Sequence, residues 1–261
     1  MILDSSNTNQ ISFENLINYE EYEFKVSAKD TAGNISQLSD AIAGIPSSSN
    51  NLFSLEFDGL DDYLLVDNQF SNLPLPSGNS SRTLACWVKL NNRSEQGVVS
   101  YGTPGVEQSC GITIHQESIC ASFWGNDLLS ADIAPINEWV HIAFTYDEQG
   151  GVRKLYINGQ LSTEDSGWEV NTILNGSFLI GKWTNNTMFT NGNIDEVSVW
   201  DRALTQQQIG DIQYESINSI DNGLVGYWRF DRGATSNAVD ISQNRNHGNI
   251  FGAVWLSLIH I

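Results

Sequence analysis

An acidic loop near residue 60 is the first place where residue types and spacing could hold a ligand. Asp58, Asp61 and Asp62 follow one another around Gly59. Calcium is bound by several carboxylate and carbonyl oxygens on a loop that wraps the ion, and a glycine permits the tight path. The pattern therefore predicts a structural calcium site. The alternative is a solvent-exposed turn at Asp61 and Asp62, with Asp58 capping local backbone.

Three tryptophans in turn-like segments are candidates for a ligand-binding surface. Trp124, Trp168 and Trp183 each lie within two residues of a glycine or asparagine. Sugars are recognised by flat apolar faces combined with polar side chains, so a tryptophan on a loop suits such a contact. The alternative is that these rings fold back on the sheet as lids.

The carboxylates and histidines of this sequence are not spaced as catalytic groups would be. A retaining glycosidase requires two carboxyl groups about 5 Å apart. Asp195 and Glu196 are adjacent, so in a strand they would point to opposite faces. His141 lies in an apolar strand pattern typical of a core or edge histidine, and neither His115 nor His247 has an evident serine or aspartate partner. We therefore expect a protein that is not an enzyme.

Short strands with regular turns must position these side chains. Apolar patterns predict strands at 55–57, 64–66, 83–90, 139–146, 152–157, 194–199, 223–231 and 250–255. Asn158 and Gly159 form a strong hairpin signal, because both tolerate positive φ. A capping-box pair, Thr205 and Gln208, predicts one short peripheral helix that ends near Tyr214. These elements indicate an all-β protein built from antiparallel sheets.

The motifs of residues 52–255 resemble the LamG-like jelly roll of the concanavalin A-like lectin/glucanase superfamily. They are Phe57-Asp58-Gly59, Asp61-Asp62-Tyr63, Trp87-Val88-Lys89, Trp139-Val140-His141-Ile142-Ala143, Tyr156-Ile157-Asn158-Gly159, Ile194-Asp195-Glu196-Val197 and Gly226-Tyr227-Trp228-Arg229-Phe230. Their order and the matching helix make the resemblance specific. It implies an antiparallel jelly-roll β-sandwich in which the first strand lies beside residues 194–199. Asp195 would thereby join the acidic loop as a fourth calcium ligand.

Residues 1–45 resemble the last strands of a fibronectin type III domain, which is an immunoglobulin-like sandwich. A half-buried strand is predicted from alternating apolar positions, which are Tyr22, Phe24, Val26 and Ala28. A turn follows in which Gly33 and Asn34 favour left-handed backbone. The resemblance makes Tyr22 the corner tyrosine of this partial domain. Because the earlier strands are not in the sequence, we expect a piece of a longer protein.

Two further segments flank the predicted jelly roll. Residues 46–51 are polar and begin with Pro46, which predicts a flexible linker. Residues 256–261 resemble the translation of a transposase end sequence used in library preparation, and we expect them to be a non-native tail. A genuine terminal strand is the alternative.

Charge and composition exclude several classes of partner. The chain carries 12 Lys and Arg against 31 Asp and Glu, a net charge of −19, which repels nucleic acid and anionic membranes. No run of 18 apolar residues is present, so membrane insertion is not expected, and any export signal lies elsewhere.

The three cysteines leave two alternatives open. Cys110 and Cys120 lie at neighbouring strand patterns, so they could form the one disulfide that the odd count allows. Alternatively, these two residues and Cys86 are buried thiols.

The sequence therefore predicts a non-catalytic binding or adhesion module of an extracellular or cell-surface protein. Its expected partner is carbohydrate or a cell-surface glycoprotein. Two alternatives remain: an accessory module that tethers a secreted enzyme to a polysaccharide, and a spacer without a ligand.

Overall fold

The chain divides into two compact units, Met1–Asn50 and Asn51–Ile261, each described here by itself. The computed structural model describes residues 22–44, 53–67, 74–174, 177–214, 217, 221–233 and 235–257. The predicted linker at 46–51 lies outside the described residues.

The described part of the first unit is a two-stranded antiparallel ladder with a turn. Strand β1 (Tyr22–Phe24) pairs with β2 (Ile42–Gly44). In the turn, the Asp30 carboxylate accepts the backbone N–H of Asn34 at 2.8 Å. Gly33 has the predicted positive φ, at 92°, whereas Asn34 does not.

The half-buried strand predicted at residues 22–28 is confirmed only at its start, where Phe24 is half-buried. Strand β1 ends at Phe24, Val26 is 63% exposed, and Ala28 is also exposed. The physical reason is that, within the described residues 22–44, the two-stranded ladder has no second sheet to cover its apolar face. The assignment to a fibronectin type III domain stays a prediction, and the side chain of Tyr22 lies outside the described set.

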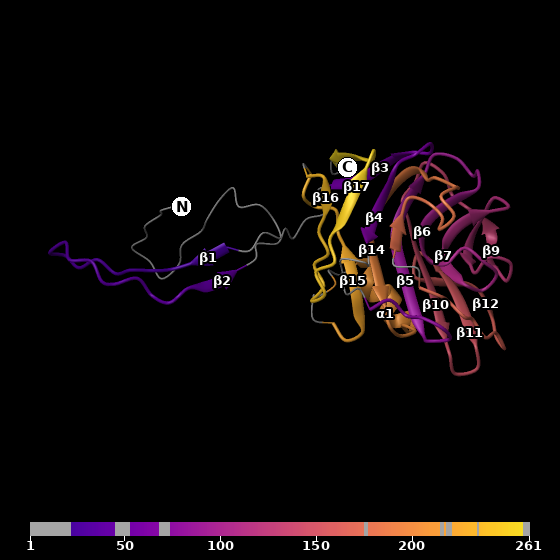
Figure 1. The fold of residues 1–261 in the computed structure, drawn as a ribbon, viewed down its shortest axis with the longest axis horizontal. Coiled ribbons are helices and arrows are strands. Elements are labelled where there is room, and N and C mark those ends of the chain that lie inside the picture. Colours follow the sequence, from indigo (N-terminus) through magenta and orange to yellow (C-terminus); the bar gives the residue numbers. More distant parts are fainter. Residues whose placement is uncertain are drawn as a thin grey trace. The chain divides into compact units, whose positions relative to one another are not determined.

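The second unit is a sandwich of two antiparallel sheets, which confirms the predicted all-β jelly-roll class (Figure 1). In order, the first sheet contains β12 (Gln160–Asp165), β11 (Val152–Ile157), β10 (Val140–Asp147), β5 (Arg82–Leu90), β14 (Asn191–Trp200), β3 (Phe53–Asp58) and β18 (Val254–Ser257), with β15 (Leu224–Trp228) also on β14. The second sheet contains β16 (Asn237–Ala238), β17 (Gly248–Phe251), β4 (Tyr63–Asp67), β13 (Ser177–Ile180), β6 (Gln96–Gly102), β7 (Ser109–His115), β8 (Ser118–Ser122) and β9 (Leu128–Ile133).

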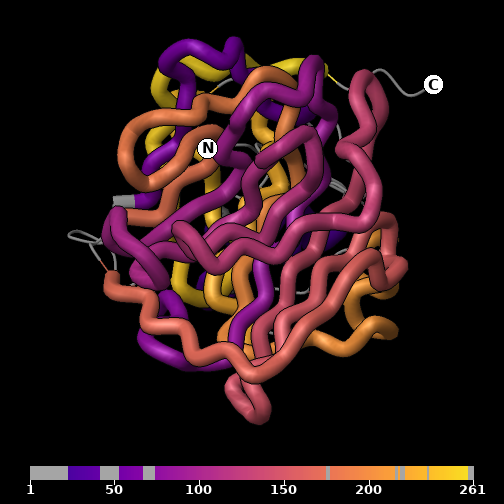
Figure 2. Tube along the Cα trace, turned by 90° about the vertical axis from the view of Figure 1, so that its right-hand side faces the viewer, coloured from indigo at the N-terminus to yellow at the C-terminus, as the bar shows by residue number. Residues whose placement is uncertain are grey.

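The main core fills the space between the two sheets. Alternate residues of each strand point inward, as Ile142 and Phe144 do on β10 and Ile112 and Ile114 do on β7. At one end of the sandwich, β9 of the second sheet lies beside β12 of the first (Figure 2). The Ser162 hydroxyl accepts the N–H of Ala131 there, so the two sheets are joined at this edge.

A second apolar cluster lies on the outer face of the first sheet under helix α1 (Gln206–Tyr214). Ile209 of the helix is fully buried in it. The predicted capping box is confirmed. The N–H of Thr205 donates to Gln208 Oε1 at 3.0 Å, and the N–H of Gln208 donates to Thr205 Oγ1 at 3.3 Å. In the described part of the chain, no helix has the length and apolar character needed to cross a membrane.

The last strand of the first sheet runs two residues beyond the predicted boundary at Trp255. In β18, Leu256 pairs with Ser54 and Ser257 pairs with Phe53. Residues 258–261 lie outside the described residues, and the non-native origin of 256–261 stays a prediction.

All three cysteines are free and buried. The strand register places Cys110 opposite Tyr101 and Cys120 opposite Thr113, so the two thiols do not face each other. Of the two alternatives, buried thiols are therefore confirmed and the disulfide is excluded. Burial raises the pKa of Cys86 and Cys120 to about 12.

Candidate functional site

The outer face of the second sheet carries small and polar residues where β7 and β8 lie side by side. Because Ile112 and Ile114 point into the core, their neighbours on β7 point outward. These neighbours are Gly111, Thr113 and His115. A concave surface can form here because a glycine leaves room for another segment to lie on the sheet.

The loop of residues 181–190 lies directly on this face, and two glycines permit it. A Cβ at Gly97 would lie 2.4 Å from the backbone nitrogen of Trp183, and one at Gly111 would lie 2.7 Å from its ring. The loop is fixed by hydrogen bonds, including one from the Ser100 hydroxyl to the Lys182 carbonyl at 2.8 Å. As a result, Trp183 is only 3% exposed, which is the predicted alternative of a ring that folds back on the sheet.

A pocket of about 230 Å³ opens between this loop and the turn after β8. It is lined by Glu95, Thr113, His115, Ser122, Trp124, Gly125, Asp127, Trp183, Asn185 and Met188. The rings of Trp124 and Trp183 are 6.3 Å apart between centroids and inclined by 32°. The structure thus brings two of the three predicted tryptophans into one site, which we call the tryptophan pocket.

Trp124 enters this pocket from a left-handed backbone conformation, with φ of 61°. Bulky side chains rarely adopt it, and such strain of about 1–3 kcal/mol persists only where the surroundings hold the residue. Asp127 supplies part of that support, because its carboxylate accepts the N–H of Phe123 at 2.8 Å and the Ser122 hydroxyl at 3.1 Å. Strained residues of this kind are concentrated at ligand sites.

Arg153 anchors the same turn from beneath. Its side chain is 1% exposed, and its guanidinium donates to the Asn126 carbonyl and, at 2.9 Å, to the Asp165 carboxylate. The ring of Phe123 lies 5.4 Å from the guanidinium carbon. Sequence reasoning missed Arg153, because its partners belong to different segments of the chain.

Trp168 lies outside the tryptophan pocket, contrary to its predicted role as a ligand contact. Its ring stacks on Arg153 at 4.5 Å, and its indole N–H donates to Asp165 at 2.8 Å. Trp168 therefore corresponds to the alternative of a lid that folds back on the protein. The physical reason is that a buried guanidinium needs both a carboxylate partner and an apolar or aromatic cover.

The floor and rim of the pocket offer polar groups. The Thr113 side chain is 1% exposed, and its hydroxyl has no hydrogen-bond partner of ordinary geometry. Across the strand pair it faces Cys120, whose thiol is a weak hydrogen-bonding group. At the rim, His115 Nδ1 lies 2.7 Å from the carboxylate of Glu95. The pocket thus combines aromatic faces with groups that can bind hydroxyls.

The three carboxylates of the acidic loop lie together, as the sequence predicted. One oxygen from each of Asp58, Asp61 and Asp62 lies within 4.8 Å of the others. The Asp58 carboxylate also accepts the N–H of Leu60 at 2.8 Å, so part of the alternative, local capping, is present as well. Burial, and then the charges of Asp58 and Asp61, raise the pKa of Asp62.

Asp195 is not part of this cluster, so the predicted fourth ligand is wrong. Strand β14 does pair with β3, but the residue opposite Asp58 is Asn191. Asp195 lies four residues further along β14, which is about 13 Å in an extended strand. It is 2% exposed, and its carboxylate accepts the N–H of Glu196 at 2.8 Å.

Glu196 takes part in a buried ionic network. It lies at an irregularity of β14 with φ of 50°. Its carboxylate accepts the hydroxyl of Tyr227 and lies 3.2 Å from the guanidinium of Arg229, which also pairs with Asp231 at 3.1 Å. Burial raises the pKa of Glu196, and Arg229 opposes that effect. These contacts give Glu196 a structural role.

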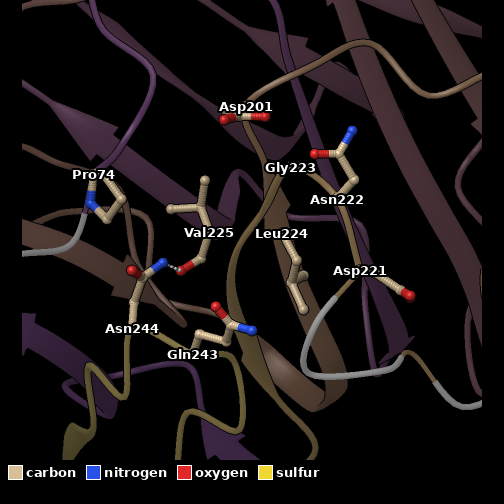
Figure 3. Close-up of a pocket in the computed structure, with 9 residues that line it drawn as sticks. All are labelled: Pro74, Asp201, Asp221, Asn222, Gly223, Leu224, Val225, Gln243 and Asn244. Carbon is tan, nitrogen blue, oxygen red and sulfur yellow. Dashed lines mark hydrogen bonds between the residues drawn. The ribbon is translucent and has the colours of Figure 1, made fainter.

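A second hollow of about 280 Å³ lies near the start of β15 (Figure 3). It is lined by Pro74, Asp201, Asp221, Asn222, Gly223, Leu224, Val225, Gln243 and Asn244. The Asn244 amide is held by a 2.8 Å hydrogen bond to the Val225 carbonyl. None of the lining residues is aromatic, so this hollow offers no flat apolar face to a sugar. The tryptophan pocket is the better candidate site.

Comparison with known families agrees with this architecture. A laminin G-type profile described as the concanavalin A-like lectin/glucanases superfamily matches residues 58–210, which is more than half of the chain. The chain belongs to this superfamily. The match contains the acidic loop and every residue that lines the tryptophan pocket.

Two relatives of this superfamily member are long proteins. The rat sushi, von Willebrand factor type A, EGF and pentraxin domain-containing protein 1 is 24% identical over 195 residues, which is 67% of this chain and 5% of the relative. The human adhesion G-protein coupled receptor D1 is 36% identical over 75 residues, 27% of this chain and 8% of the receptor. The chain therefore spans under a tenth of these two curated relatives.

Among solved structures, a protein of Bacteroides ovatus described as a candidate carbohydrate-binding protein has the same fold. It is 18% identical to this superfamily member, with a TM-score of 0.65 over 95% of this chain and 72% of the other. At that level of identity the likeness concerns the fold.

Proposed function

We propose that this chain is a non-catalytic carbohydrate-binding module of an extracellular or cell-surface protein, and that it binds sugar in the tryptophan pocket. The observation that carries the proposal is the meeting of Trp124 and Trp183 over the buried hydroxyl of Thr113, whose one partner is the weakly bonding thiol of Cys120. An indole face packs against the C–H face of a sugar ring, while a hydroxyl at the floor binds one of its polar groups.

The carboxylates of the pocket favour binding over catalysis. Asp127 is held by Phe123 and Ser122, and Glu95 is paired with His115. Carboxylates held in this way can orient the hydroxyls of a ligand, which is a binding role. The Bacteroides ovatus protein of the same fold carries a description of the same ligand class.

A glycan array probed with the full chain tests this function. We expect discrete hits that Trp124→Ala weakens at least about tenfold, because Trp124 is the more exposed of the two rings. Tyr214→Ala is the matched control, since Tyr214 is an aromatic residue at the end of α1 that is 82% exposed and outside the pocket. A blank array would favour a spacer without a ligand.

We also propose that the acidic loop binds a structural calcium ion through Asp58, Asp61 and Asp62. The convergence of three carboxylates supports the proposal, as does the pKa of Asp62, which burial and then the charges of Asp58 and Asp61 raise. A divalent cation would relieve this repulsion and hold the loop between β3 and β4.

A further inference from the structure

We propose that the tryptophan pocket selects non-acidic saccharide units and excludes sugars that carry a carboxylate, such as uronic and sialic acids. This inference rests on the proposed carbohydrate-binding function and adds the chemical class of the ligand. Its basis is the distribution of charge and of hydrogen-bond acceptors around the two indole rings.

The titratable groups that line the pocket are mostly acidic. Glu95 and Asp127 contribute carboxylates, and the Glu95 side chain is 53% exposed at the rim. None of the lining residues is lysine or arginine. Such cations form the strongest hydrogen bonds to a sugar carboxylate, and arginine is favoured because its fork matches both oxygens. An acidic sugar would instead meet two like charges.

Three cations close to the pocket walls are committed elsewhere. Arg93, two residues before Glu95, donates to the carbonyl of Ala134 at 2.5 Å. The ammonium of Lys182 lies 3.2 Å from the ring centroid of Tyr63 and donates to the Asn186 side chain at 2.6 Å. Arg153 is buried and paired with Asp165. None of the three lines the pocket, so none is placed to neutralise an anionic ligand.

The histidine of the pocket does not change this balance. His115 lies against Glu95, with 2.7 Å between its Nδ1 and the carboxylate, and its Nε2 lies 3.3 Å from the side-chain amide of Gln116. Protonation of His115 would therefore be compensated within the rim by Glu95. The surplus of negative charge from Asp127 would remain.

The free hydrogen-bonding capacity of the pocket matches hydroxyl or amine donors. An ionised carboxylate only accepts hydrogen bonds, and the Asp127 side chain uses one of its two oxygens for Phe123 and Ser122. The Thr113 hydroxyl at the floor can accept as well as donate. The volume of about 230 Å³ lies below the roughly 300–1,000 Å³ typical of pockets for drug-sized ligands, which suits a short saccharide segment.

Matched glycan pairs test the selectivity. Calorimetry on the full chain would compare neutral oligosaccharides with counterparts that differ only by a carboxylate, such as galactose against galacturonic acid units and lactose against sialyllactose. We expect the neutral member of each pair to bind at least about tenfold more tightly. Glu95→Gln should narrow that ratio by removing a rim charge, whereas Asp211→Asn, an exposed carboxylate on α1, should leave it unchanged.

The outcomes separate this inference from the function beneath it. Tighter binding of the acidic members would overturn the selectivity and leave carbohydrate binding intact. An unchanged ratio in Glu95→Gln would also overturn the role given to the rim charge. Failure of every neutral and acidic glycan to bind would overturn both the proposed function and its ligand class.

Discussion

At the scale of single residues, Trp124 links backbone strain to ligand recognition. Its ring reaches the pocket only because the backbone adopts φ of 61°, a conformation suited to glycine. The surrounding hydrogen bonds from Phe123 and Ser122 to Asp127 hold this conformation. Backbone strain and the proposed ligand contact therefore lie in the same residue. A substitution that relieves the strain and removes the ring can show how each contributes to stability and to binding.

Trp124→Gly should separate them. Glycine removes the aromatic face but relieves a left-handed conformation that costs other residues about 1–2 kcal/mol. We expect the free energy of unfolding to stay within about 1 kcal/mol of the wild type, measured by urea denaturation, while glycan binding is lost. A large loss of stability in Trp124→Gly would show that the ring is a packing element instead.

His141 predicts a pH dependence of stability. Its ring lies on β10 against Trp87, and burial lowers its pKa from 6.5 to about 4. The unfolded chain then binds the proton more tightly than the folded chain. The stability associated with neutral His141 is complete above about pH 6.5 and is lost as pH falls toward 4, by on the order of 3 kcal/mol.

Denaturation of the wild type and His141→Phe at pH 7, 5.5 and 4.5 would measure this effect. Acidic residues titrate in both proteins, so the difference between the two curves isolates the histidine. We expect the wild type to lose more stability than the variant between pH 7 and 4.5. Parallel curves would contradict the buried neutral state of His141.

At the scale of elements, the turn after β8 depends on a residue of another sheet. Arg153 belongs to β11 of the first sheet, and it holds the Asn126 carbonyl next to the pocket while Trp168 covers it. The pocket wall is thus braced across the sandwich. This contact explains why a surface turn can hold a strained tryptophan.

Arg153→Met should damage both the fold and the pocket. The variant leaves the Asp165 carboxylate and the Asn126 carbonyl without their donor, so we expect a loss of about 2–3 kcal/mol in urea denaturation and weaker glycan binding. Lys154→Met is the matched control, because its 3.2 Å pair with Glu164 is exposed and such pairs contribute about 0–1 kcal/mol. Equal effects of the two variants would refute the bracing role.

Local patterns explain which elements could be predicted from sequence. Strand alternation and the capping box of α1 involve neighbours along the chain, so the β-sandwich and the helix were both predicted correctly. Register is not local. The prediction that β3 and β14 are neighbours was right, but Asn191 rather than Asp195 lies opposite Asp58.

The pocket itself depends on contacts that a linear pattern does not contain. Trp124 and Trp183 meet because Gly97 and Gly111 on different strands let the 181–190 loop lie on the sheet. Trp168 has a similar turn context in the sequence, yet the buried charge of Arg153 determines its position. Composition near a tryptophan can thus indicate a loop, but not the surface on which the ring packs.

At the scale of the whole molecule, the sandwich carries a large excess of negative charge. The chain has a net charge of −19, and the acidic loop concentrates three carboxylates between β3 and β4. Self-repulsion of this kind destabilises a compact state unless counterions relieve it. Metal binding at one loop can therefore influence the stability of the whole second unit.

Removal of calcium should lower the melting temperature of the full chain. At a calcium concentration about 100 times Kd, binding stabilises a folded protein by about 2.7 kcal/mol, which corresponds to a shift of about 5–10 °C for a unit of this size. We expect EDTA to produce such a decrease and added calcium to reverse it.

Substitutions in the acidic loop test whether it is the site from which EDTA removes calcium. The double change Asp61→Asn and Asp62→Asn should abolish the response to EDTA, and Asp211→Asn should retain it because Asp211 lies on α1 outside the cluster. A melting curve that EDTA does not move would show that the cluster is a hydrated acidic turn.

The three unbridged thiols have a consequence for how this fold behaves in different redox surroundings. Cys86, Cys110 and Cys120 are all buried, and none forms a disulfide. The stability of the sandwich therefore does not depend on cysteine oxidation, and we expect it to be the same under reducing conditions. Each thiol becomes available to an alkylating reagent only when the strand around it opens. The rate at which each cysteine is alkylated would therefore report how often the strand around it opens locally.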